Sequence, residues 1–206
     1  MTTWDMIKAE RAALVEALAA LPSDAWDAPS LASKWTVRDV VAHMIATAQM
    51  NPPKFVGAMM GAGFNFQTMT AKRIADVKAG RSDADLVETY RSLVGARSAP
   101  PGPAPSWLGE TIVHGEDIFR ALGAYRAHPA EHVVTVGNFY SKSNLLIGAK
   151  RRIEGVTLRA TDTNWIVGMG PEVNGAAVAL VMAMTGRKVA LDDLTGPGVE
   201  LLRSRS

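Results

Sequence analysis

Hydrophobic residues recur at helical spacing over much of the amino-terminal part of the chain. A first helix is expected over residues 3–20, because the proline-containing segment that follows ends the periodic pattern. A second helix is expected from Thr36, which stands three residues before Asp39 in capping-box spacing, to Asn51, which precedes two prolines. This second helix is apolar nearly all round, so we expect it in the middle of a bundle.

Glycine and proline interrupt the helical pattern further along. Residues 55–97 are helical in tendency but broken by glycines, and a new helix is expected to begin at Ser82. A stiff proline-rich connector over residues 98–106 follows. The next helix is expected over 107–123, closed by a glycine, and a fifth over 129–150.

The pattern changes after the fifth helix. Alternating polar and apolar positions predict two strands, a continuous apolar run predicts a buried helix, and a final strand is expected. These four elements are expected at residues 155–162, 164–170, 175–186 and 198–205. The sequence therefore predicts an α+β protein: a mainly α-helical bundle over residues 1–126, followed by a small α/β domain over 127–206 that is led by a helix.

Composition narrows the class of function. The chain has 206 residues, 48% of them hydrophobic, and a formal net charge of only +2 with cations and acids interleaved, so we expect no nucleic-acid partner. No apolar run is long enough to cross a membrane, and the amino terminus does not resemble a signal peptide, so we expect no membrane partner and a cytoplasmic location. Cysteine is absent, which excludes disulfides, thiolate metal ligands and a cysteine nucleophile within the chain.

The helix over 107–123 carries the residues best suited to chemistry. On a helix with 3.6 residues per turn, His114 and Asp117 lie within about 40° of Glu110, so all three share one narrow face. Glu116 and Arg120 are expected to form an exposed pair on another face. By itself, a glutamate four residues before a histidine is often a surface pair.

His43 is the candidate on the second predicted helix. Its neighbours are almost all apolar, so burial keeps the imidazole neutral, which is the form that binds a metal. A lone histidine in such a place is more often a core residue. Together with Glu110 and His114, however, it supplies three ligands between two bundle helices, and three protein ligands with one open position are typical of a catalytic zinc site.

The remaining candidates are weaker. Asp117 fits an orienting carboxylate, a general base or a structural partner of an arginine, and Asp39 is favoured as a helix cap over an orienting partner of His43. His128 and His132 are expected to be solvated. The tryptophans at positions 35 and 165 are expected to be core residues, and the glycines near residue 170 do not have the spacing of a dinucleotide-binding motif.

Three stretches resemble a known family. They are "KWTVRDVVAHM", "ETIVHGEDIFRALG" and the carboxyl-terminal "LRATDTNWIVGMGPEVNGAAVALVMAMTGR…LTGPGVELL". In that order they are similar to the mycothiol-dependent maleylpyruvate isomerase family of the DinB-like metal-binding superfamily, and together they span nearly the whole chain. The resemblance implies a DinB-like four-helix bundle. It also implies a divalent metal, with zinc expected, held by His43, Glu110 and His114, and mycothiol as the thiol cosubstrate.

The expected function is a metal-dependent, mycothiol-dependent enzyme, either a thiol S-transferase or a cis–trans isomerase of the maleylpyruvate isomerase type. Its partners would be a small-molecule electrophile, which the sequence does not name, and a low-molecular-weight thiol. Two alternatives stay open. One is a metal-dependent hydrolase that uses metal-activated water with Asp117 as the base. The other is a non-catalytic metal-binding protein.

Overall fold

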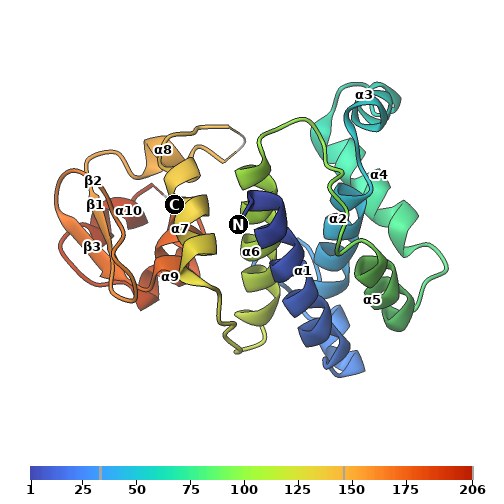
Figure 1. The fold of residues 1–206 in the computed structure, drawn as a ribbon, viewed down its shortest axis with the longest axis horizontal. Coiled ribbons are helices and arrows are strands. Elements are labelled where there is room, and N and C mark those ends of the chain that lie inside the picture. The colour runs from blue at the N-terminus through green and yellow to red at the C-terminus, as the bar shows by residue number, and fades with distance from the viewer. Residues whose placement is uncertain (33, 146, 206) are drawn as a thin grey trace. The chain divides into compact units, whose positions relative to one another are not determined.

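The computed structural model describes residues 1–32, 34–145 and 147–205. The chain divides into two compact units, Met1–Arg126 and Ala127–Ser206, which are described one at a time (Figure 1). That each unit folds independently as a domain stays a prediction. Within the described ranges, no helix is long and apolar enough to span a membrane.

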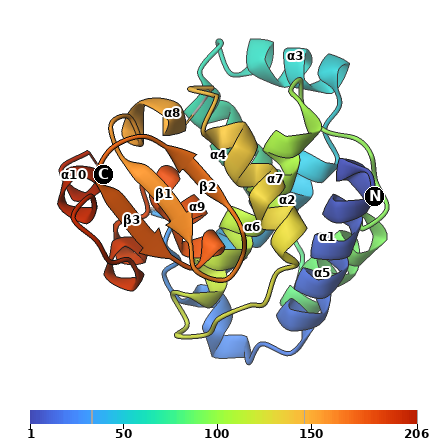
Figure 2. The same cartoon turned by 60° about the vertical axis from the view of Figure 1, so that its left-hand side comes forward.

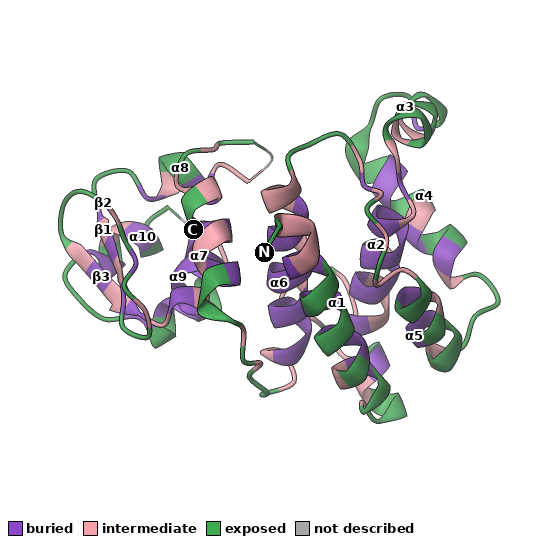
Figure 3. Ribbon diagram, in the orientation of Figure 1, coloured by how far each residue is buried: buried purple, intermediate pink, exposed green. Residues whose placement is uncertain are grey.

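The first unit is an α-helical bundle. Its helices are α1 (Thr3–Ala19), α2 (Val37–Ala48), α3 (Pro52–Gly61), α4 (Phe66–Lys78), α5 (Asp83–Ser92) and α6 (Ala104–Phe119), with a short 3-10 turn η1 (Ser23–Asp27) before α2. Helix α2 packs against α4, α5 and α6, and α1 packs against α5 and α6. Nine of the 12 residues of α2 are buried, which confirms the central position predicted for this helix (Figure 3).

Capping boxes fix where three of these helices begin. In each, a hydroxyl side chain accepts the backbone N–H of an aspartate three residues on, and the aspartate in turn accepts the backbone N–H of the cap. The pairs are Thr2 with Asp5, Thr36 with Asp39, and Ser82 with Asp85. The predicted capping role of Asp39 and the predicted helix start at Ser82 are therefore confirmed.

Helix α6 departs from the prediction in two ways. It begins at Ala104, inside the expected proline-rich connector, and ends at Phe119 rather than at residue 123. The prediction of an exposed Glu116–Arg120 pair is wrong, because eleven of the 16 residues of α6 are buried and Glu116 is only 1% exposed. The Arg120 Nε donates a 2.6 Å hydrogen bond to the buried Glu116 carboxylate.

The second unit places helices against a three-stranded sheet (Figure 2). Its elements are α7 (Ala130–Tyr140), α8 (Ala149–Arg152), β1 (Thr157–Ala160), β2 (Ile166–Gly168), β3 (Glu172–Gly175), α9 (Ala177–Met184), the 3-10 turn η2 (Lys188–Asp193) and α10 (Val199–Arg203). The strand order is β2-β1-β3, with β1 antiparallel to β2 and parallel to β3. Helix α9 packs against β1, β3 and α7, so it forms the core of this unit. Helices first and a small mixed unit afterwards confirm the predicted α+β class.

Two element predictions in this unit are wrong, and one strand was not predicted. The helix expected over 129–150 stops at Tyr140, and α8 begins only after Gly148, whose φ of 64° is left-handed. The strand expected over 198–205 is the helix α10, because its buried residues Val199 and Leu202 are three apart and so share a helical face. Strand β3 was not predicted, since four residues with two glycines nearby give little periodic signal.

The structure also tests the predicted burial of Trp165 and the predicted exposure of His132. Trp165 is buried as expected, and its indole N–H donates a 3.0 Å hydrogen bond to the Asn138 side chain. The expectation that His132 is solvated is wrong, because this residue is 1% exposed within α7. His132 is the third residue of α7 and shares a helical face with the buried residues Val136 and Tyr140, which explains the burial.

Candidate metal centre

Helices α2 and α6 bring the three predicted ligands together. Helix α2 carries His43, and α6 carries Glu110 and His114. The two helices run in opposite directions at this point: His43 lies against His114, and Thr47, one turn further along α2, lies near Glu110, one turn back along α6. The i,i+4 spacing of Glu110 and His114 therefore matches the i,i+4 spacing of Thr47 and His43.

The distances within the cluster are short. The His43 Nε2 lies 3.9 Å from the Glu110 Oε1, and the ring centroids of His43 and His114 are 5.0 Å apart, with the rings nearly perpendicular. The side chains of His43, Glu110 and His114 keep 18%, 11% and 15% of their surface exposed. The cluster is thus largely dry but still reachable from solvent.

Burial sets the charge state of the cluster. Desolvation, with the nearby His114 as a second cause, lowers the pKa of His43 to about 3, so its imidazole is neutral at pH 7. Desolvation raises the pKa of Glu110, while His114, Arg11 and the hydrogen bond from Thr47 act in the opposite direction. The Glu110 Oε1 is buried and has no hydrogen-bond partner in the described part of the chain. A buried carboxylate oxygen without a partner is unfavourable, and a bound cation would satisfy it.

Asp117 lies behind His114. Its Oδ2 is 2.9 Å from the His114 Nδ1, and its side chain is fully buried. The Asp117 backbone carbonyl also accepts a 2.9 Å hydrogen bond from the Leu31 N–H, which ties the segment before α2 to α6. With Asp117 ionised, the His114 Nδ1–H donates to it, so the Nε2 of that ring carries the free lone pair. Of the three roles considered for Asp117, this contact favours the orienting one.

Trp35 covers the two imidazoles. Its ring centroid is 4.8 Å from that of His43 and 6.0 Å from that of His114. The Trp35 carbonyl accepts hydrogen bonds from both the backbone N–H and the hydroxyl of Ser30, at 2.9 Å and 2.8 Å, which fixes this loop. Trp35 was expected in the core; it is only partly buried, and it packs on the candidate ligands.

Sequence reasoning missed the contribution of two residues. Thr47 had a usable signal, because it is four residues after His43 and so lies on the same helical face. Trp35 had none, since its contact depends on the loop before α2. Asp39, by contrast, is engaged elsewhere: its carboxylate caps α2 and accepts a 2.6 Å bond from the Lys78 ammonium.

The donor set fits a divalent metal ion. In the described part of the chain, no group of three or more His, Cys, Asp or Glu side chains is already arranged to hold a metal ion. Ligand atoms of a tetrahedral zinc ion lie about 3.3 Å apart, given bond lengths of about 2.0–2.1 Å. The 3.9 Å between the His43 Nε2 and the Glu110 Oε1 is close to this value. The imidazoles of His43 and His114 and the Glu110 carboxylate are of the ligand types that bind zinc.

The comparison with protein families decides the membership of the chain. The model described as the mycothiol maleylpyruvate isomerase N-terminal domain matches residues 7–119, more than half of the sequence. The chain belongs to this family. The matched region runs from α1 to the end of α6, so it includes His43, Glu110 and His114.

Solved structures support the same fold. Two crystal structures of the mycothiol-dependent maleylpyruvate isomerase, one of them of a histidine-to-alanine mutant, are similar to this chain with TM-scores of 0.64 and 0.62. Each comparison has 14% sequence identity and covers 95% of this chain and 91% of the other. This likeness confirms the predicted DinB-like α+β fold. No curated protein sequence matches the chain.

Proposed function

We propose that this chain is a metal-dependent, mycothiol-dependent enzyme, either an S-transferase or a cis–trans isomerase of the maleylpyruvate isomerase type. The observation that carries the proposal is the cluster of three side chains: the His43 Nε2 lies 3.9 Å from the Glu110 Oε1, which is buried without a hydrogen-bond partner among the described residues, and the His114 ring lies 5.0 Å from the His43 ring. Membership of the family supports it, as does the enzyme named in the structures of similar fold.

The residues of the cluster have separate tasks. His43, Glu110 and His114 would hold the ion, with zinc expected. When bound, the ion would supply a Lewis acid with an open position, which lowers the pKa of a thiol or a water. The neutral imidazole of His43 offers its lone pair at pH 7, and Asp117 keeps the proton of His114 on Nδ1. Trp35 limits the access of water to both rings.

A thiol nucleophile has to come from outside the chain, because the sequence contains no cysteine. In an isomerisation, the sulfur of the cosubstrate would add to the double bond of a conjugated acid, moving the electron pair onto the conjugated carbonyl. Rotation about the resulting single bond and loss of the same thiolate would then give the trans product. In an S-transfer, the carbon–sulfur bond would persist in the product, and the displaced electron pair would either take up a proton or depart with the leaving group of the electrophile.

The experiment compares the purified protein with and without zinc. We expect one zinc per chain and a rise in Tm on adding mycothiol that occurs only in the zinc-loaded protein. His43→Ala and His114→Ala should lose both the metal and the response to mycothiol, whereas His128→Ala, outside the cluster, should keep them. Unchanged metal content in both cluster variants would overturn the proposal.

Hydrolysis of model esters without any thiol would instead support the hydrolase alternative. The full burial of Asp117 and its contact with His114 argue against Asp117 as the general base of such an enzyme. Metal binding without a response to thiol and without turnover would support the non-catalytic alternative.

A further inference from the structure

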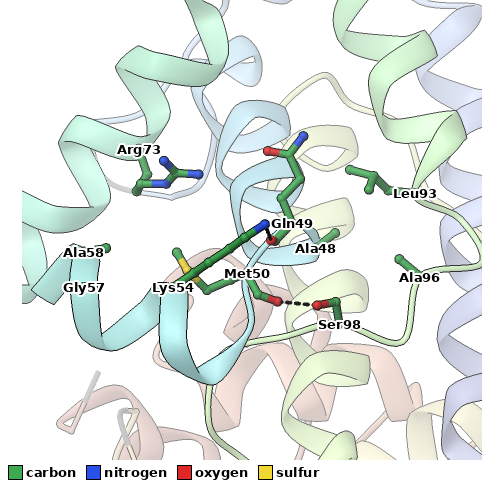
Figure 4. A pocket seen from close by; sticks show the side chains of 10 residues that line it. All are labelled: Ala48, Gln49, Met50, Lys54, Gly57, Ala58, Arg73, Leu93, Ala96 and Ser98. Atoms are coloured by element: carbon green, nitrogen blue, oxygen red, sulfur yellow. Dashed lines mark hydrogen bonds between the residues drawn. The ribbon is translucent and has the colours of Figure 1, made fainter.

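A pocket of about 700 Å³ lies at the carboxyl-terminal end of α2, and none of the three candidate metal ligands lines it. Its walls come from α2, α3, α4 and the segment that follows α5 (Figure 4). Ser98 donates a 2.7 Å hydrogen bond to the Met50 carbonyl, which ties that segment to the end of α2. The pocket is open to solvent, and the α3 residues of its wall are not buried.

The lining combines an apolar wall with two cations. Most lining residues are small or apolar, and the charged ones are Lys54 and Arg73. No acidic residue lines the cavity, and the sequence contains no aspartate or glutamate between residues 40 and 75. The local charge of the cavity is therefore positive.

Neither cation is well satisfied by the protein. The Lys54 ammonium makes a long, 3.4 Å contact with the Gln49 carbonyl (Figure 4). Arg73 is 3.5 Å from the largely exposed carboxylate of Asp76, and its Nε is buried without a hydrogen-bond partner in the described part of the chain. The Arg73 side chain is nevertheless 34% exposed, so an anionic ligand in the pocket can reach the accessible part of its guanidinium.

We propose that this cavity binds an amphipathic organic anion, that is, a carboxylate attached to an aliphatic or aromatic body. Arg73 and Lys54 would bind the carboxylate, and the wall that includes Met50 and Leu93 would contact the apolar body. A small inorganic anion would leave most of this wall uncovered, and a neutral apolar molecule would leave the two cations of the lining without an anion. The inference does not depend on a metal or on the proposed reaction.

Octanoate is the probe, and isothermal titration calorimetry on the full chain is the measurement, at fixed ionic strength with a chelator present. We expect saturable binding of one octanoate per chain, tightening about two- to fourfold for each methylene from hexanoate to octanoate. Octan-1-ol should bind at least tenfold more weakly, because it lacks the charge. Inorganic phosphate should not compete at equal concentration. His114→Ala should bind octanoate normally, which separates this site from the candidate metal centre.

Three variants test the residues. Arg73→Gln should weaken octanoate binding at least tenfold. Gly57→Leu should weaken it at least fivefold without lowering Tm, because Gly57 lines the cavity within α3 and has open space where a side chain would begin. Lys72→Gln removes a charge next to Arg73 that is outside the lining, so it should change the affinity less than twofold.

Four results would overturn the inference. They are no saturable binding of octanoate at millimolar concentration, equal affinity for octan-1-ol, equal competition by phosphate, and equal weakening by Lys72→Gln and Arg73→Gln. If the protein bound octanoate normally but did not bind zinc, the anion site would be supported and the proposed function would be contradicted.

Discussion

Glu110→Gln should affect the stability of the protein in opposite directions without and with bound zinc. Glutamine keeps the size of the side chain and removes its charge. In the metal-free protein the Glu110 Oε1 is buried, and no described residue donates a hydrogen bond to it. Removing this charge should therefore raise stability, whereas with zinc present it should remove a ligand.

The expected size follows from the cost of an unpartnered buried group, about 1–3 kcal/mol and more for a charged one. The glutamine amide is itself buried and partly unsatisfied, so we expect a net gain of about 1–2 kcal/mol in the free energy of unfolding of the metal-free protein. For a chain of this length, this corresponds to a rise in Tm of about 2–8 °C.

Glu116→Gln is the matched control on the same helix. Glu116 is also buried, but its carboxylate accepts a 2.6 Å hydrogen bond from the Arg120 guanidinium, whose side chain is 7% exposed. Weakening this buried pair should lower the free energy of unfolding by about 2 kcal/mol or more, with or without metal. Both glutamates thus lie on α6 and are largely covered, but the Glu116 carboxylate is paired with Arg120, whereas the Glu110 Oε1 has no hydrogen-bond partner among the described residues.

Thermal unfolding by circular dichroism, in chelator and in excess zinc, measures both effects. Zinc at about 100 times its Kd should stabilise the native protein and Glu116→Gln by about 2.7 kcal/mol. It should not stabilise Glu110→Gln measurably. If Glu110→Gln lowered the metal-free Tm as much as Glu116→Gln does, the Glu110 Oε1 would have a partner within the fold, and the reasoning would be wrong. If zinc stabilised all three proteins equally, Glu110 would not be a ligand.

Three further substitutions have defined outcomes. Asp117→Asn should lower zinc affinity about 10- to 100-fold, by competition with a chelating dye, because it disturbs the hydrogen bond that orients His114; unchanged affinity would contradict the orienting role. Gly137→Ala should destabilise the protein by about 1–3 kcal/mol in urea unfolding, since a Cβ there would lie 2.4 Å from the Trp165 ring; an unchanged urea midpoint would contradict this close packing. Thr36→Ala should cost about 1 kcal/mol in the same assay through loss of the α2 cap, and a cost near zero would argue against it.

The sequence predicted best where local signals and packing agree. The capping box at Thr36 and the apolar surface of the helix after it predicted both the start and the central position of α2. The spacing of Glu110 and His114 placed them on one face of α6, and the structure brings that face to His43. The period of the apolar residues in a helix is sufficient for such predictions, because it identifies the face of the helix that will be buried.

Features that depend on tertiary packing were not predictable in this way. Glu116 and Arg120 have the spacing of a surface pair, and only the packing around α6 makes them buried. The polar and apolar residues of segment 198–205 alternate weakly, which is compatible with a strand. In the structure the segment is helical, because Val199 and Leu202 are buried on one helical face. The cavity beside Lys54 gave no sequence signal, since its walls come from four separate segments.

The central claim is that His43, Glu110 and His114 bind one divalent metal ion. Anomalous diffraction at the zinc absorption edge, from crystals grown with zinc, tests it most directly. The account predicts one strong peak about 2.0–2.2 Å from a nitrogen of each imidazole and from the Glu110 carboxylate. A peak elsewhere in the chain, with none between these three side chains, would contradict it.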